Sequence, residues 1–330
     1  MRLGSLIALI VGLAATAALV AWVGAGEVGD ALFVAGVPGV LAITLFNAAP
    51  IAICGIAWRA LIEPAPARAT ALMIWVRFLR ASVSEIVPIG GELLALRVMT
   101  LHGIGVVRAG ASIVVDMTLE LVSQLAFTAL GLALLVLDGR GGGLAAWLAV
   151  GLAAALMVVA GFLLAQSLGL FRWLERLPHR LAMHAPWARP PGLAGLHAEI
   201  HALYRRPGAL TRGFLWHGLG WIIGVGEAWL ALWFLDAPLG FGDVLIIESL
   251  AFALRSAAFA IPGALGVQEG GYVALGALFG LGPDVALALS LLKRAREILL
   301  AVPALLAWKL VEVRAWRRAA DGAIPEPTSP

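Results

Sequence analysis

Charged residues are scarce in this sequence. Asp, Glu, Lys and Arg make up 13% of the 330 residues, against roughly 25% in soluble globular domains, and 62% of the residues are hydrophobic. The mean hydropathy is +0.97. This composition excludes a soluble protein, and at about 20 apolar residues per span it fills about six to ten transmembrane helices. Little chain remains for a soluble catalytic domain of about 100 residues.

Other features that define common protein classes are also missing. Cys54 is the single cysteine, which excludes an intramolecular disulfide and a cysteine-rich metal site. The net charge of +3 is too small to indicate a nucleic-acid partner. No phosphate-binding loop or nucleophile elbow occurs, and His197, Glu199 and His201 have the order H-x-E-x-H instead of the metalloprotease order. We therefore expect no metal, no cofactor and no ATP-driven step.

What the sequence has is long apolar runs. They lack the alternation typical of an outer-membrane β-barrel, and their Leu, Ala, Gly and Val content favours helices. The sequence therefore predicts an all-α polytopic membrane protein with about eight transmembrane segments. The runs cover Leu3–Ala25, Ala31–Ile62, Thr70–Val87, Ala109–Leu137, Leu144–Phe171, Gly213–Leu235, Val244–Ile261 and Val285–Leu310.

The arginines near the ends of these runs predict the orientation, because Lys and Arg accumulate in cytoplasmic loops. Arg59, Arg68, the stretch 172–212 and the tail 313–330 are expected on the cytoplasmic side, with both termini. Region 70–101 then begins and ends on the cytoplasmic side, whereas region 244–282 begins and ends outside. Each region is therefore predicted to be a re-entrant helical hairpin, and the two enter from opposite faces.

The two hairpin regions share a residue order of Arg, Ser, Pro, Gly and Glu. We expect a single transmembrane domain with a first half 1–171, a cytoplasmic interfacial linker 172–212, a second half 213–312 and a tail 313–330. Inverted halves with broken helices are typical of transporters. Chance similarity in a Gly- and Ala-rich sequence is the alternative, and helix packing through small residues is the alternative role of the glycines. The expected hinge residues are Pro88, Gly90 and Gly91 in the first half and Pro262, Gly263, Gly266, Gly270 and Gly271 in the second.

A small set of charged residues falls inside the predicted spans and hairpins. Each would cost roughly 3 kcal/mol if it were left unpaired in lipid, so these residues must pair or line a polar cavity. Ion pairs that lock the hairpins to the long helices are one interpretation. A midplane chamber for a lipid headgroup is the other, and we favour it because buried ion pairs stabilise poorly. The candidate substrate-binding residues are Arg80, Glu92, Arg97, Asp116, Glu120, Arg255, Glu269, Lys293, Arg294, Arg296 and Glu297.

Four segments resemble the hopanoid-biosynthesis-associated integral membrane proteins, a family within the superfamily that shares the flippase-like transmembrane domain of lysylphosphatidylglycerol synthases. These segments are 88–97, 111–120, 255–271 and 291–297. The resemblance implies a multi-pass protein of the bacterial inner membrane that moves a hopanoid or an anionic phospholipid between leaflets. It does not imply lysyl transfer, since the soluble aminoacyltransferase domain of the larger synthases is missing here. A membrane-embedded lipid-modifying enzyme and a scaffold for hopanoid synthesis remain alternatives, as does a homo-oligomer.

Overall fold

The computed structural model describes residues 14, 16–62, 68–84, 90–140, 142–167, 195–258 and 261–322. These residues form helices and short connections, with no strand among them. The elements are α2 (Ala25–Phe46), α3 (Ala48–Arg59), α4 (Ala69–Ser84), α5 (Gly90–Leu101), α6 (Val106–Leu137), α7 (Gly142–Ser167), α9 (Leu196–Tyr204), α10 (Pro207–Phe234), α11 (Phe241–Ala257), the 3₁₀ turn η1 (Pro262–Ala264), α12 (Val267–Ala277) and α13 (Pro283–Gly322).

Three helical stretches are long and apolar enough to cross a membrane: Ala25–Arg59, Val106–Leu137 and Ala146–Gln166. The helical, membrane-embedded class predicted from the sequence is therefore confirmed. The count of eight segments stays a prediction, because only these three stretches among the described residues meet the length and hydropathy expected of a span. The run Leu3–Ala25 begins outside the described residues, and the hinge residue Pro88 also lies outside them.

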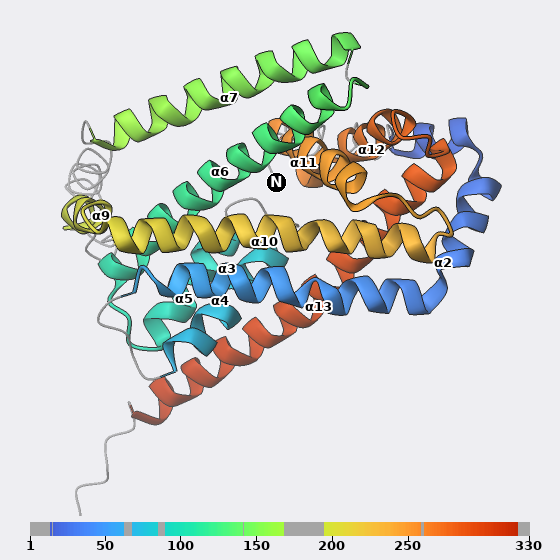
Figure 1. Ribbon diagram of the computed structural model, residues 1–330. Helices are drawn as coiled ribbons and strands as arrows, with labels where there is room; N and C mark the ends of the chain where they lie inside the picture. The colour runs from blue at the N-terminus through green and yellow to red at the C-terminus, as the bar shows by residue number, and fades with distance from the viewer. Residues whose placement is uncertain are drawn as a thin grey trace, which may run out of the picture.

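Large apolar side chains are exposed along several helices. Phe33 on α2 is 87% exposed, Trp147 on α7 is 77% exposed and Leu137 at the end of α6 is 83% exposed. α7 packs along α6 and leaves most of its surface open (Figure 1). In a soluble protein such surfaces would drive aggregation. In a membrane they face the acyl chains, which agrees with the composition.

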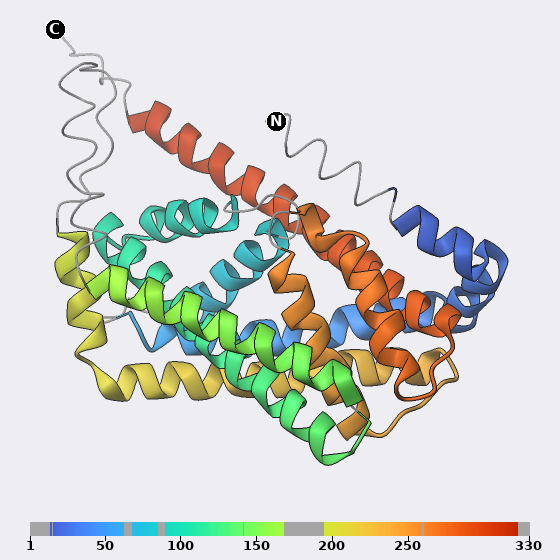
Figure 2. The ribbon, with the colours of Figure 1, turned by 90° about the horizontal axis from the view of Figure 1, so that it is seen from above.

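Two units of the molecule have the same order of elements. Each has a helix of moderate length, a break, a short helix and then a long helix: α4, α5 and α6 have 16, 12 and 32 residues, and α11, α12 and α13 have 17, 11 and 40. The pair α4–α5 lies in the half of the molecule that holds α9, and the pair α11–α12 lies in the half that holds α2 (Figures 1 and 2).

The long helix of each unit packs against the other unit. The long helix α6 of the first unit packs against α11 of the second, and the long helix α13 of the second packs against α4 of the first. α10 packs against α6 of the first unit and α11 of the second, so it lies beside both units. Each unit also has an apolar core, one around Met73, Leu79 and Met99 and the other around Ile247 and Leu250. The junction between the units is consequently lined by helices of both.

A polar seam joins α6 to α11. Gln124 Nε2 donates a 2.5 Å hydrogen bond to Ser256 Oγ, and Thr128 Oγ1 donates a 3.4 Å bond to the carbonyl oxygen of Ser249. Gly131 completes the face, since residues 124, 128 and 131 lie on one side of a helix. A Cβ at Gly131 would collide with the Ser249 hydroxyl. The close approach of the two helices therefore requires glycine at this position.

Replacement of Gly131 by alanine is expected to destabilise the protein. Alanine favours a helix by about 1 kcal/mol over glycine, but overpacking at a tight interface costs about 1–3 kcal/mol. Gly161→Ala on α7 is the matched control, because a Cβ there meets nothing within 4 Å. Thermal unfolding in detergent should show a lower midpoint for Gly131→Ala than for Gly161→Ala. Equal midpoints would contradict the packing of α6 on α11.

Candidate functional site between the two units

The first charge cluster joins α4, α5, α6 and α10. At its centre, Arg80 on α4 contacts three carboxylates. Its Nη1 lies 2.7 Å from Asp116 Oδ2, its Nη2 lies 3.1 Å from Glu120 Oε2, and its Nε lies 3.3 Å from Glu92 Oε1. The members of the cluster are Arg77, Arg80, Glu92, Asp116, Glu120 and His217.

Arg77 and His217 complete the pairing of the two acids on α6. The guanidinium of Arg77 binds Glu120 through both terminal nitrogens, with a distance of 2.7 Å from Nη1 to Oε2. His217 Nε2 on α10 lies 3.0 Å from Asp116 Oδ1, and both side chains are fully buried. Asp116 and Glu120 are four residues apart, so one helix face presents both acids to α4 and α10. Asp116 is closed off by protein, whereas the Glu120 side chain stays 21% exposed.

The second charge cluster joins α10, α11, α12 and α13. Arg255 Nη1 on α11 lies 2.6 Å from Glu297 Oε1 on α13. Arg294 Nε lies 3.0 Å from Glu269 Oε1, and its Nη1 lies 3.3 Å from Glu297 Oε2. The members of this cluster are Glu227, Glu248, Arg255, Glu269, Lys293, Arg294, Arg296 and Glu297.

Lys293 is held by an acid and by aromatic rings. Its Nζ lies 2.6 Å from Glu248 Oε2, and Tyr272 donates a 2.5 Å hydrogen bond to the other oxygen of that carboxylate. The ammonium also lies 5.4 Å from the ring centroid of Phe252 and 5.6 Å from that of Tyr272. An ammonium at this distance from aromatic rings is attracted by their negative faces.

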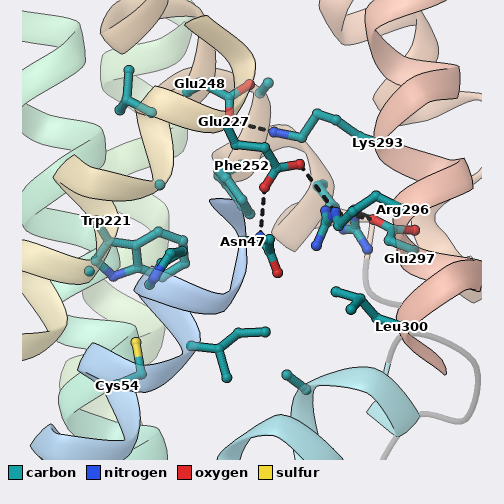
Figure 3. Close-up of a pocket in the computed structure, with 18 of the residues that line it drawn as sticks. Asn47, Cys54, Trp221, Glu227, Glu248, Phe252, Lys293, Arg296, Glu297 and Leu300 are labelled. Carbon is teal, nitrogen blue, oxygen red and sulfur yellow. Dashed lines mark hydrogen bonds and ion pairs between the residues drawn. The ribbon is translucent and has the colours of Figure 1, made fainter. Parts of the chain in front are cut away.

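Glu227 on α10 bridges α2 and α13. Asn47 Nδ2, at the end of α2, donates a 2.6 Å hydrogen bond to Glu227 Oε2, and Arg296 Nε lies 3.1 Å from Glu227 Oε1. Figure 3 shows these contacts as dashed lines beside Lys293 and Glu297. The Glu227 side chain is 4% exposed, so this carboxylate is buried between the three helices.

Glu269 has a structural role at the break before α12. Its Oε2 accepts a 2.7 Å hydrogen bond from the backbone N–H of Gly266, which caps the helix, while Oε1 pairs with Arg294. Gly263 and Gly266 have φ angles of 61° and 79°, a conformation that costs other residues energy. Ala264 between them has a φ of 48°, so glycine occupies two of the three left-handed positions in this turn between α11 and α12.

A cavity of about 200 Å³ lies between the two clusters (Figure 3). Arg77 and Glu120 reach it from the first cluster, and Glu227, Glu248, Arg255, Lys293, Arg296 and Glu297 reach it from the second. Apolar and aromatic groups complete the wall, among them Phe127, Trp221 and Phe252. Trp221 lies on one side of the cavity in Figure 3, and Arg296 and Glu297 lie on the other. The arrangement offers charges of both signs next to aromatic rings.

The structure brings ten of the eleven predicted site residues into the two clusters and leaves one apart. Arg97 lies on the exposed side of α5, and it is not part of the ion pairs that define the two clusters. Five of the eleven line the cavity, namely Glu120, Arg255, Lys293, Arg296 and Glu297. The other five clustered residues are Arg80, Glu92, Asp116, Glu269 and Arg294, which pair behind the wall.

Four members of the clusters are not among the residues predicted from the sequence. Arg77, His217, Glu227 and Glu248 all lie within apolar runs, where an ionisable side chain is costly. The same cost argument that selected Asp116 therefore applied to them as well. Arg77 and Glu248 belong to the two hairpin regions, and His217 and Glu227 belong to the run Gly213–Leu235, but none of the four is part of the repeated Arg, Ser, Pro, Gly and Glu order.

The fold and the site define a helical membrane protein with a charged internal cavity at the junction of two similar units. The family model of the lysylphosphatidylglycerol synthase TM region matches residues 7–306. The chain belongs to this family, which makes it a lipid-related, flippase-like membrane protein and confirms the wider superfamily of the resemblance. The association with hopanoids stays a prediction. No curated protein and no solved structure matches the chain.

Proposed function

We propose that the protein moves a membrane lipid between leaflets by passing its polar headgroup through the cavity between the two units. The observation that carries this proposal is the set of charged residues, from both units, that lines one cavity in a membrane protein. Charged groups at membrane depth typically mark a pathway for a polar substrate. The family match supports a lipid as the substrate.

The size of the cavity suits a headgroup and not a whole lipid. Its volume of about 200 Å³ is below the range of about 300–1,000 Å³ that is typical of sites for drug-sized molecules. The acyl chains would then remain in the bilayer, against the exposed apolar faces of the helices, while the headgroup crosses in the protein. We propose a hopanoid or a phospholipid of the bacterial inner membrane as the lipid.

The proposed route also agrees with the arrangement of the two units. The pairs α4–α5 and α11–α12 lie in opposite halves of the molecule, an arrangement that suits re-entrant hairpins entering from opposite faces (Figures 1 and 2). In transporters with inverted repeats, the substrate site lies near the midplane at the interface of the repeats. We propose that the cavity is this site, with cytoplasmic termini and the stretch 172–212 on the same side.

Removal of one charge from each cluster tests this proposal. Glu120→Gln and Arg294→Gln are expected to slow lipid movement by about tenfold or more, because each leaves buried partners unpaired at or behind the cavity wall. Arg212→Gln is the matched control, since this arginine is exposed on α10. Vesicles with acyl-labelled phospholipid and a membrane-impermeant quencher give the rates, normalised to folded protein. Wild-type rates in both variants would refute the proposal.

A further inference from the structure

The charges that line the cavity sum to zero. Four basic side chains face four carboxylates: Arg77, Arg255, Lys293 and Arg296 against Glu120, Glu227, Glu248 and Glu297. A headgroup with a net charge would therefore find no excess of the opposite charge on the cavity wall. Uncompensated charge of this kind strongly disfavours binding. A headgroup that carries one charge of each sign leaves the sum unchanged. The zero net charge of the cavity wall therefore favours lipids whose headgroup has zero net charge.

A headgroup that carries one positive and one negative charge can replace the ion pair between Arg77 and Glu120 with two ion pairs of its own. Both side chains line the cavity and bind each other. The Glu120 side chain is 21% exposed, which is the highest value among the acids of the two clusters. A ligand anion can replace Glu120 on Arg77, while a ligand cation replaces Arg77 on Glu120. Neither protein charge is then left unpaired, so the exchange avoids the cost of an isolated buried charge.

Unused donors lie at the basic end of this pair. The Nε atom of Arg77 and the hydroxyl of Ser82 are buried and have no hydrogen-bond partner among the described residues. Ser82 is 3% exposed, and both residues line the cavity from α4. Buried donors of this kind are costly unless something accepts from them. A phosphodiester supplies several acceptor oxygens, and the arginine fork suits it well.

Aromatic rings lie at the acidic end. Trp221 donates a 3.0 Å hydrogen bond to Ser123, which is one helical turn after Glu120 on α6. Its ring stacks at 5.9 Å on Phe127 and meets Phe252 at 5.0 Å, and all three rings line the cavity. Phe252 already attracts one ammonium, that of Lys293. A carboxylate beside aromatic rings is the environment that binds an ammonium group.

We infer that the cavity takes the headgroup of a zwitterionic phospholipid, whose phosphate binds Arg77 and Ser82 and whose ammonium binds Glu120 beside Trp221. The inference rests on the proposed function and adds the substrate class to it. It replaces the anionic phospholipid that the sequence resemblance suggests with a lipid of zero net charge. Both charged groups of the headgroup are used, one at each end of a single ion pair.

The test compares two acyl-labelled lipids, phosphatidylethanolamine and phosphatidylglycerol, in vesicles with the same protein. We expect the zwitterionic lipid to move about tenfold faster than the anionic one. Glu120→Gln makes the wall net positive and removes the partner of the ammonium, so the ratio of the two rates should fall. Arg77→Gln makes the wall net negative, so the ratio should rise. The ratio is insensitive to the fraction of protein that folds.

Two further variants separate local charge from other causes. The double variant Arg77→Gln/Glu120→Gln restores the neutral wall, and its ratio should lie between those of the single variants. Trp221→Leu should slow phosphatidylethanolamine several-fold more than phosphatidylglycerol, so the ratio of the two rates should fall. Equal or faster movement of phosphatidylglycerol in the wild type, or shifts of the ratio in the same direction in both single variants, would overturn the inference alone. Movement of neither lipid would overturn the proposed function as well.

Discussion

Modification of Cys54 with a bulky thiol reagent is expected to abolish lipid movement. Cys54 is the only cysteine of the chain, lines the cavity from α3 and is partly accessible. Its sulfur lies against α10, where a Cβ at Gly220 would come within 3.0 Å of it. N-ethylmaleimide at this position would occupy much of a cavity of about 200 Å³ and exclude a headgroup. The rate of transbilayer movement before and after modification measures the effect.

The size of the adduct is the control for this experiment. A methylthio group is small, so its addition to Cys54 is expected to reduce movement far less than N-ethylmaleimide does. Cys54→Ala should move lipid and resist both reagents, which excludes reaction elsewhere. Mass spectrometry of the protein reports the extent of modification. Full movement by completely modified protein would show that the headgroup does not pass beside Cys54.

Replacement of Arg80 by glutamine is expected to cause the largest loss of stability. The Arg80 side chain is 7% exposed, pairs with three carboxylates and lies 5.4 Å from the ring centroid of Trp58. Its removal leaves three acids close together in the protein interior with Arg77 as their main remaining cation. Removal of one partner from a buried ion pair costs about 3–5 kcal/mol. Thermal unfolding in detergent should show the decrease, and lipid movement should fall with it.

Arg97→Gln is the matched comparison. Arg97 was predicted to belong to the same site, but it lies on the exposed side of α5. We expect little change in the unfolding midpoint and in lipid movement, since exposed ion pairs contribute about 0–1 kcal/mol. A loss in Arg97→Gln as large as that in Arg80→Gln would contradict the central position of Arg80 in the first charge cluster.

The position of Arg97 was within reach of sequence reasoning. Glu92 and Arg97 are five residues apart on α5, which places them about 140° apart around the helix axis. They do not share a face, so both cannot point into one cluster. Asp116 and Glu120 are four apart and do share a face, and the structure turns both toward Arg80. The angular position around the helix axis therefore distinguishes Arg97 from the residues that join the first charge cluster.

The identity of the partners was not within reach. Glu297 pairs with Arg255 from α11, and Glu227 pairs with Arg296 and Asn47 from α13 and α2. These contacts depend on how helices far apart in the chain pack, and one sequence contains no measure of that packing. Composition determines that the chain is helical and membrane-embedded, and the cost of a charge in lipid selects the buried charges. Which charge meets which is decided by tertiary structure.

The two interpretations of the buried charges apply to different residues. Arg80, Asp116, Glu269 and Arg294 pair behind the wall, which is the role expected of ion pairs that hold helices together. Arg77 and Glu120 pair at the wall itself and face the cavity. The charged residues therefore fall into two groups, the ion pairs behind the wall and the residues that line the cavity. In our proposal only the residues that line the cavity exchange partners with a lipid.

Photo-crosslinking of lipid to the cavity wall tests the account most directly. A benzophenone amino acid at Phe252 probes the cavity, and the same group at Phe33, which is 87% exposed on α2, probes the outer surface. Mass spectrometry of the crosslinked lipid identifies the attached carbon. We expect attachment through the headgroup at position 252 and through an acyl chain at position 33. Attachment through acyl chains at both positions, or no lipid at position 252, would contradict it.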